Sequence, residues 1–527
     1  MTWLLALILL PVVGAVVVAT MKANDRLALR TALVLSIVEF LLIIPFWASY
    51  SPSGARLQQT SSMDWIPGFG IHISFGTDGV SLIMIAVIAL LVPIVVGALG
   101  VTDKLPPGRS AGGFLSLILL QEALTIGVFA ATDVFLFYVL FEIMLIPMYF
   151  LIGGYGGPNR QYAAVKFFLY SFLGGLIMLA SAIGAYSLAE DKLGKGTFDW
   201  ATLVTVVRDA PTGTQIWLFL GFFLAFAIKA PLVPFHTWLP DAAGQAPIGV
   251  AVLLVGVLDK VGTFGFLRYC LPMFPEASKQ LAPLVLVLAV AGVLYGSILA
   301  AGQRDMKRFI AYVSIAHFGF IALGIFTFNE QAMAGSVSYM LNHSLATGML
   351  IVVVGMIVVR GGSTKISDYG GMSKVTPLLA GMLLLAGLST LSLPGTNSFV
   401  SEFLVLLGSF VDHPVYAIIA TVGMVLAAAY VLWLYQRVMT GPLSGDALLK
   451  PGPAPVESDT PAGGGAVTAV AAEPVAKKTI KDLGGREIAI LAPLVVLIIG
   501  LGFYPKPVLD TITPSVQQTM SAVNGGK

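Results

Sequence analysis

The stretch FLAFAIKAPLVPFHTWLPDA, residues 223–242, decides how this sequence folds. It begins as an apolar helix, places Lys229 within it and follows closely with Pro231 and Pro234. Proline lacks a backbone N–H and clashes with the preceding turn, so a helix is expected to break there. The segment therefore predicts an interrupted apolar helix with an ammonium group beside the break.

The composition indicates a lipid environment. Of 527 residues, 57% are hydrophobic and 11% are charged, and the mean hydropathy is +0.91. These values are typical of a polytopic membrane protein. A net charge of +2 without a basic stripe argues against a nucleic-acid partner. One cysteine, Cys270, argues against a disulfide framework and any iron–sulfur or four-ligand zinc site built by this chain alone, so we expect no cofactor or metal here.

Hydropathy predicts an all-α polytopic fold with about fourteen transmembrane spans. The twelfth contains Pro394 and Gly395 in its middle and should also be broken. With the N-terminus outside, the inner loops carry more than twice as many Lys and Arg as the outer ones, which favours both termini outside. The predicted spans are 2–21, 28–48, 79–101, 112–131, 133–152, 162–188, 213–235, 246–270, 281–301, 308–327, 331–359, 376–411, 414–439 and 487–505.

Three connecting segments are long enough for their structure to be predicted separately. Residues 50–78 predict a small hairpin on the outer surface, and residues 189–212 predict a short amphipathic piece at the interface. The Pro/Gly/Ala-rich segment 441–485 is typical of a disordered linker on the cytoplasmic side.

The sequence also repeats. Ser171 precedes Gly175 by four residues in the sixth span, and Ser344 precedes Gly348 in the same way in the eleventh. The two broken spans, seven and twelve, are likewise five apart. An odd separation makes partner spans run in opposite directions, which predicts two inverted five-helix repeats, spans 4–8 and 9–13. The predicted units are 1–111 with the outer hairpin, repeats 112–270 and 281–440, the linker 441–485, and the last helix with an outer tail, 486–527.

Many ionisable side chains fall within the predicted spans. Each would cost on the order of 2.5 to 3.5 kcal/mol at a lipid-facing helix centre, so the set predicts a shared polar interior. Acids beside lysines can exchange protons, and histidines can serve as intermediate carriers, so we predict a proton relay. The set comprises Glu39, Glu122, Glu142, Lys229, His236, Asp259, Lys260, His317, His343 and Glu402.

Structural roles are the competing interpretation. Lys229 could extend to the interface from a helix end, and His317 and His343 could be packing residues. Glu39 and Glu122 could pair near an interface. Asp259 adjoins Lys260, and neighbouring residues on a helix do not face each other, so the two need not be partners.

Several long strings resemble one family. They resemble the proton-translocating, antiporter-like subunits of respiratory NADH-quinone oxidoreductase (complex I), and the resemblance covers about residues 75–440. It rests on QEALTIGVFAATDVFLFYVLFEIMLIPMYFLIGGYGG, FAIKAPLVPFHTWLPDAAGQAPIGVAVLLVGVLDKVGTFGFLR, AGQRDMKRFIAYVSIAHFGFIALG, MLNHSLATGMLIVVVG and LSTLSLPGTNSFVSEFLVLLGSF.

The resemblance implies roles for individual residues. Glu142 matches the channel glutamate of the fifth helix, Lys229 its paired lysine, and Lys260 the central lysine of the eighth helix. Several related subunits carry lysine in the broken twelfth helix and one branch carries glutamate, so Glu402 favours that branch. Asp259 departs from the apolar residue expected there. The positions His236, His317 and His343 match the polar axis, with Glu122 and Asp259 as possible additions.

The resemblance also implies partners and leaves alternatives. FMN, iron–sulfur clusters and quinone are expected in partner subunits, and the neighbours should be antiporter-like subunits of the L and N type in a bacterial inner membrane. A subunit of an Mrp-type sodium/proton antiporter, a membrane subunit of an energy-converting hydrogenase or formate complex, and a purely structural scaffold are the alternatives.

Overall fold

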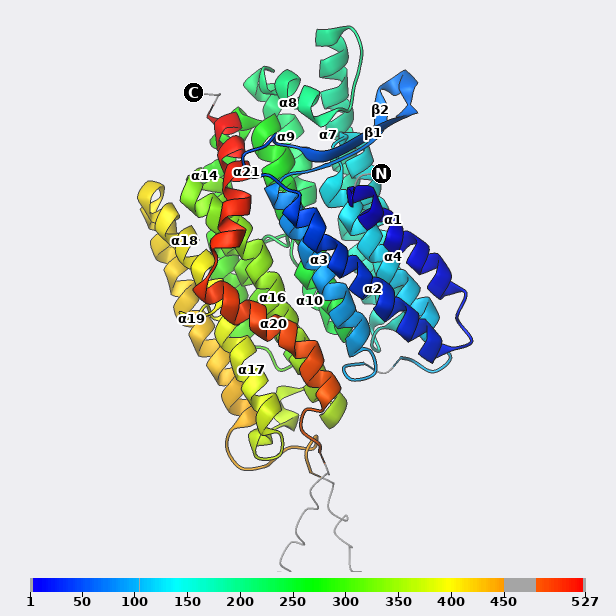
Figure 1. Ribbon diagram of the computed structural model, residues 1–527. Coiled ribbons are helices and arrows are strands. Elements are labelled where there is room, and N and C mark those ends of the chain that lie inside the picture. Colours follow the sequence, from blue (N-terminus) through cyan, green and yellow to red (C-terminus); the bar gives the residue numbers. More distant parts are fainter. Residues whose placement is uncertain (1–2, 104, 450–479, 525–527) are drawn as a thin grey trace, which may run out of the picture.

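The computed structural model describes residues 3–103, 105–449 and 480–524, and most of them are helical. The helices run side by side as one bundle (Figure 1). The first ten are α1 (Trp3–Ala19), α2 (Asp25–Ala48), α3 (Gly79–Ala98), α4 (Ala111–Ala130), α5 (Val134–Ile143), α6 (Leu145–Tyr155), α7 (Arg160–Leu193), α8 (Trp200–Arg208), α9 (Thr212–Lys229) and α10 (Leu239–Gln245). The chain continues through α11 (Ile248–Leu253), η2 (Leu254–Leu258), α12 (Lys260–Gly265), η3 (Phe266–Cys270), α13 (Leu271–Met273), α14 (Pro275–Ala301), α15 (Met306–Phe326) and α16 (Glu330–Gly361). It ends with α17 (Pro377–Thr390), α18 (Asn397–Asp412), α19 (Pro414–Met439), α20 (Gly485–Phe503) and α21 (Lys506–Val523).

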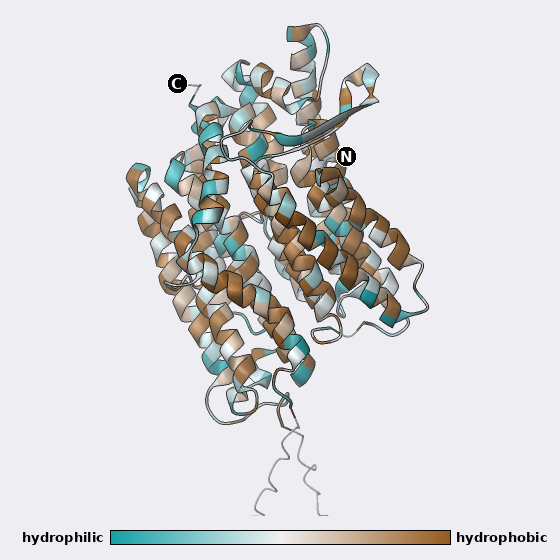
Figure 2. Cartoon of the chain, viewed as in Figure 1, coloured by the Kyte–Doolittle hydropathy of each residue, from teal (hydrophilic) through white to brown (hydrophobic). Residues whose placement is uncertain are grey.

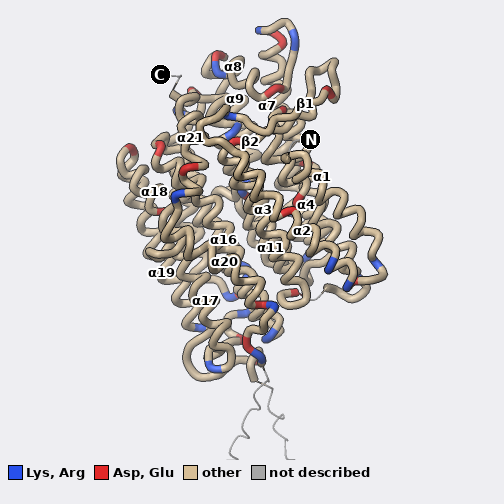
Figure 3. The backbone as a smooth tube through the Cα atoms, in the orientation of Figure 1, with Lys and Arg blue, Asp and Glu red and all other residues tan. Residues whose placement is uncertain are grey.

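The predicted all-α polytopic fold is confirmed. Within the described chain, 12 helices or helical runs are long and apolar enough to cross a membrane. The shorter α1 and the interrupted pair α17 and α18 supply the remaining predicted spans. Apolar residues cover the outer faces of the bundle (Figure 2), as a hydrocarbon solvent requires. Most charged residues lie towards the two ends of the bundle (Figure 3).

The seventh span breaks earlier than its hydropathy predicted. The prediction carried the helix to residue 235, whereas α9 ends at Lys229 and α10 begins at Leu239. Pro231 cannot donate a backbone hydrogen bond, so the regular ladder stops there. The indole of Trp238 donates to the carbonyl of Ile228 at 2.9 Å and satisfies a backbone group that the break leaves free.

The twelfth span breaks at its predicted place. α17 ends at Thr390 and α18 begins at Asn397. Ser392 and Gly395 between them have φ values of 61° and 94°, which no continuing right-handed helix contains. The broken helices 7 and 12 of the predicted inverted repeats are therefore α9/α10 and α17/α18, and each follows a long helix, α7 or α16.

Smaller elements cover one end of the bundle. Strands β1 (Gln58–Ile66) and β2 (Ile71–Thr77) pair antiparallel with Asp64 opposite His72, as the predicted hairpin requires. The 3-10 turn η1 (Pro67–Phe69) joins them, and α8 is the predicted amphipathic piece. Both chain ends lie at this end of the bundle (Figure 1). Two further 3-10 turns, η4 (Ile366–Asp368) and η5 (Met372–Lys374), precede α17.

The C-terminal helix α21 was not predicted. Its half-polar sequence contains Pro514 and lacks the hydropathy of a span. Its buried face nevertheless packs against α3 and α16. Gly79 permits this approach, because a Cβ there would lie 2.2 Å from the carbonyl oxygen of Thr511. The predicted linker 441–485 falls largely outside the described residues, which stop at 449 and resume at 480.

Candidate functional site

The central lysine, Lys260, lies fully buried at the start of α12. Its ammonium nitrogen lies 2.5 Å from the carbonyl oxygen of Val255 and 2.7 Å from Nδ1 of His343. The ring centroid of Phe318 lies 4.9 Å from the same nitrogen. Lys260 is therefore held against α16, on which His343 lies, and not in a lipid-facing position.

From His343 a row of polar side chains leads to the second broken helix. The rings of His343 and His317 have centroids 5.3 Å apart. Nδ1 of His317 lies 2.5 Å from the hydroxyl of Tyr339, which donates to Oε2 of Glu402 at 2.8 Å. We call Lys260, His343, His317, Tyr339 and Glu402 the buried line; each is at most 3% exposed.

The broken helix completes the far end of the buried line. The hydroxyl of Ser392, in the break itself, also donates to Oε2 of Glu402. Asn342 and Asn397 bond to each other's amide and carbonyl groups and fix α16 against the start of α18. The irregular backbone thus positions a hydroxyl on the carboxylate, which a continuous helix would not place there.

The hydrogen bonds define the proton positions along the line. A phenol has one hydrogen, so a Tyr339 hydroxyl that donates to Glu402 must accept from His317 Nδ1. Neutral His317 then has a bare Nε2, which makes no hydrogen bond to any described residue. A proton arriving at that Nε2 can displace the Nδ1 proton towards Tyr339 and, in turn, the Tyr339 proton towards Glu402.

Glu142 and Lys229 form the matching cluster in the first half. The Lys229 side chain is fully buried at the last residue of α9, with its nitrogen 5.3 Å from the ring centroids of both Phe141 and Phe167. It interacts electrostatically with the Glu142 carboxylate on α5. Neither group makes a hydrogen bond to another described residue. Buried charges without direct partners are costly and are typical of functional sites.

Gly175 makes room for the Glu142 carboxylate. A Cβ at Gly175 would lie 1.5 Å from Oε1 of Glu142, so any side chain there must displace the carboxylate. If Glu142 belongs to the predicted proton relay, we expect Gly175→Ala to lower proton transport by about threefold or more, because a misplaced proton carrier loses rate steeply with distance. Proton uptake by inverted membrane vesicles measures this. Gly154→Ala is the control, because a Cβ there has no neighbour within 4 Å; equal pumping by both variants would contradict the positioning role.

His236 lies outside the buried line, although the sequence grouped it with the relay. It is buried within the first break, between α9 and α10, with its ring centroid 5.0 Å from that of Tyr295. Its charged neighbour is Lys166 on α7. Lys166 in turn binds Asp241 at 2.7 Å, and Asp241 also binds Arg308 at 2.8 Å.

Asp241 joins the two repeats through these ion pairs. It lies on α10, whereas Lys166 lies on α7 and Arg308 on α15. Burial acts to raise the pKa of Asp241, but the hydrogen bonds from the two cations outweigh it and hold the pKa below its usual value. His236, which lies in the first break, therefore has this ionic cluster as its charged neighbour.

Glu122 is also separate from the buried line. It is fully buried on α4 and interacts with Glu39 on α2, and neither carboxylate bonds to another described residue. Asp259, the other possible site residue, lies at the junction of η2 and α12. Sequence reasoning missed Tyr339 and Ser392, since a lone hydroxyl in an apolar helix or a turn has no chemical signature.

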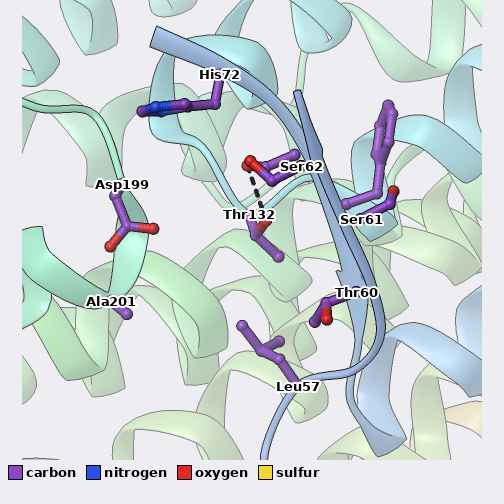
Figure 4. A pocket seen from close by; sticks show the side chains of 10 residues that line it. Leu57, Thr60, Ser61, Ser62, His72, Thr132, Asp199 and Ala201 are labelled. Atoms are coloured by element: carbon purple, nitrogen blue, oxygen red, sulfur yellow. Dashed lines mark hydrogen bonds between the residues drawn. The ribbon is translucent and has the colours of Figure 1, made fainter. Parts of the chain in front are cut away.

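The hairpin covers a polar pocket of about 420 Å³ at its end of the bundle. His72, Asp199, Ser62 and Thr132 line it (Figure 4). Asp133 accepts from the backbone N–H of His72, which lines the pocket, and from the backbone of α5, and burial raises the pKa of that carboxyl. The lining includes no member of the buried line, so this pocket is a separate feature.

The described residues contain no group of three or more His, Cys, Asp or Glu side chains that could hold a metal ion. What they do contain is two interrupted helices, each with ionisable side chains buried beside it. An apolar bundle with these features has the architecture of a membrane transporter.

Comparisons with known proteins identify the family. Residues 131–427 match the family described as NADH:quinone oxidoreductase/Mrp antiporter, TM. The chain is 43% identical to "NADH-quinone oxidoreductase subunit M" of Mycobacterium tuberculosis, over 99% of this chain and 94% of that protein. A chain of respiratory complex I from Thermus thermophilus superposes with a TM-score of 0.84 at 30% identity, covering 99% of each chain.

A more distant likeness concerns the fold alone. A chain of the Mrp complex from Dietzia sp. superposes with a TM-score of 0.82 at 21% identity, over 99% of this chain and 100% of that one. The chain therefore belongs to the NADH:quinone oxidoreductase/Mrp antiporter family, and within it to the subunit M branch of NADH-quinone oxidoreductase.

Proposed function

We propose that this chain is the proton-translocating M-type subunit of an NADH-quinone oxidoreductase. The observation that carries the proposal is the buried line, which begins at Lys260 in the centre of the bundle and ends at Glu402 beside a helix break. A structural scaffold needs no such row, because each member costs free energy to bury. The membership of the chain in the subunit M branch supports the same assignment.

The redox chemistry is assigned to partner subunits. FMN, iron–sulfur clusters and quinone in those subunits would carry electrons from NADH, and the single Cys270 of this chain suits no cluster. Antiporter-like subunits of the L and N type are the proposed neighbours. The proposed location is the inner membrane of a bacterium, with both termini outside.

In this mechanism the Glu142 and Lys229 pair controls the electrostatic field at Lys260. The buried line then carries the proton from Lys260 to Glu402. A proton from the inner side is held by Lys229 and then by Lys260. When a neighbouring subunit changes its charge, the Glu142 carboxylate is drawn from Lys229, and the electrostatic field at Lys260 changes with it. Lys260 then gives its proton to His343. Transfer through His317 and Tyr339 delivers it to Glu402, from which it leaves outward.

Substitutions at the first-half pair test the proposal. We expect Lys229→Ala and Glu142→Ala each to lower quinone-linked proton pumping by about threefold or more while the complex still assembles, because the charge that controls Lys260 is lost. Pumping is measured in inverted vesicles by fluorescence quenching after NADH addition, and assembly is measured by native electrophoresis. The matched controls are Lys192→Ala and Glu276→Ala, whose side chains are 47% and 56% exposed.

The outcomes separate the proposal from its alternatives. Unchanged pumping in both variants would remove the assignment of the pair. Sodium-dependent quenching without NADH would favour a sodium/proton antiporter. Co-purification with hydrogenase or formate-oxidising proteins, and not with an NADH dehydrogenase, would favour the energy-converting hydrogenase or formate complex.

A further inference from the structure

The helix that carries Lys260 has an unusual winding just before it. The N–H of Asp259 bonds to the carbonyl of Leu254, five residues earlier, at 3.1 Å, and residues Leu254–Leu258 form a π-turn. Such a turn holds one residue more than an α-turn and rotates the next part of the helix about its axis. Asp259 is the first residue beyond this turn, so the π-turn sets the direction of its side chain.

The packing of α12 fixes which way Asp259 faces. A Cβ at Gly262 would lie 2.5 Å from both the backbone nitrogen of Ala230 and the carbonyl oxygen of Phe226, so Gly262 touches the end of α9. Residues three apart on a helix share a face. Asp259 therefore lies on the seam with α9, at the level of the first break and close to Lys229.

The electrostatics agree with this placement. The Asp259 carboxylate interacts with the ammonium groups of both Lys260 and Lys229. Lys229 interacts electrostatically with both Asp259 and Glu142. Adjacent side chains on a helix point in different directions. The Asp259 carboxylate can therefore reach Lys229 on the α9 side, while the neighbouring Lys260 side chain extends to α16.

The packing around Asp259 gives its carboxylate no structural role. It is fully buried, and neither carboxylate oxygen makes a hydrogen bond to any described residue. A structural aspartate is normally satisfied by hydrogen bonds, as Asp133 is by the backbone of α5. A carboxylate kept free between two ammonium groups is arranged to accept a proton.

We propose that Asp259 carries the proton between Lys229 and Lys260 and so connects the first half of the subunit to the buried line. Lys229 gives its proton to the carboxylate, which leaves a neutral amine and a carboxylic acid. The acid then gives the proton to a neutral Lys260 amine and becomes a carboxylate again. Each step moves one proton and no electrons. The inference rests on the proposed function and adds a residue to it.

The test is Asp259→Asn in the assembled complex. It keeps the size of the side chain and removes its ability to take up and release a proton, so we expect pumping per assembled complex to fall by about tenfold. Asp259→Glu restores a carboxyl group and is expected to recover pumping to within about twofold of the native complex. Thr263→Val is the control; Thr263 is buried one turn further along the same helix and bonds only to the Lys260 carbonyl among the described residues.

A second variant covers a failure of assembly. If the Asn variant does not assemble, Asp259→Leu is used, because apolar replacements of buried charges are often tolerated. Normal pumping by either assembled variant overturns the inference, and so does loss of assembly in the Asn, Leu and Glu variants alike, which would mark a structural role. If Lys229→Ala pumps poorly and Asp259→Asn pumps normally, this inference is wrong but the proposed function stands. If Lys229→Ala, Glu142→Ala and Asp259→Asn all pump normally, the proposed function is wrong as well.

Discussion

Replacing Lys260 with methionine is expected to lower NADH-driven proton pumping by about tenfold or more, because loss of a positioned proton carrier has effects of this size or larger. Lys260 is the cation of the buried line, and its nitrogen lies 2.7 Å from His343 Nδ1. Methionine fills a similar volume and is compatible with the buried position, so the complex should still assemble. Pumping in inverted vesicles, normalised to assembled complex, measures the effect.

Two further variants make this prediction sharper. Lys279→Met changes a lysine that is 40% exposed and should leave pumping unchanged. Lys260→Arg keeps the positive charge, but a guanidinium does not release its proton at physiological pH. We therefore expect the Arg variant to pump as poorly as the Met variant. Full pumping by Lys260→Arg would show that only the charge at this position matters and would contradict its role as a carrier.

Much of the fold follows from hydropathy and proline positions. An apolar stretch in lipid must satisfy its own backbone groups, so it must be helical. Pro231, Pro234 and Pro394 located the two interruptions, because proline cannot continue the ladder. The apolar stretch continues to residue 235, so hydropathy did not give the exact end of α9 at Lys229, where the Trp238 indole bonds to the carbonyl of Ile228 from across the break.

The terminal helix α21 shows a different limit of the sequence. Its apolar face is too narrow to predict a span, and its place in the bundle comes from packing against α3 and α16. Gly79 and the Ser515 hydroxyl, which accepts from the Gly79 N–H at 2.9 Å, create that contact over a separation of 436 residues. A contact between such distant parts of the chain leaves no local signal.

The sequence allowed us to predict which residue types form the candidate site, but not which of these side chains contact one another. Charges in apolar spans singled out Lys229, Lys260 and Glu402, because lipid makes each of them costly. The same criterion also singled out His236 and, as a possible addition, Glu122, which the structure places beside Lys166 and Glu39 respectively. The free-energy cost of burying charged side chains in lipid indicates that a polar interior exists. Only the packing of the helices decides which of these side chains contact one another.

Tyr339 is the clearest example of a connection that the sequence conceals. Nothing in SVSYMLNHS distinguishes this tyrosine from the other aromatic residues of the spans. Tyr339 and His343 lie four residues apart and so share one face of α16. That face meets α15 at His317 and α18 at Glu402, and the hydroxyl becomes the bridge between them.

Tyr339→Phe is accordingly expected to lower pumping by about tenfold, because it removes the donor and acceptor between His317 and Glu402 and leaves the ring in place. Tyr269→Phe is a matched control, because Tyr269 is also fully buried but its hydroxyl bonds to no described residue. Both variants lose one hydroxyl from a buried ring, so a difference between them reports the connection and not the packing. If Tyr339→Phe pumps as well as Tyr269→Phe while Lys260→Met does not, the proton reaches the outer side without Tyr339, and the buried line ends at the histidines.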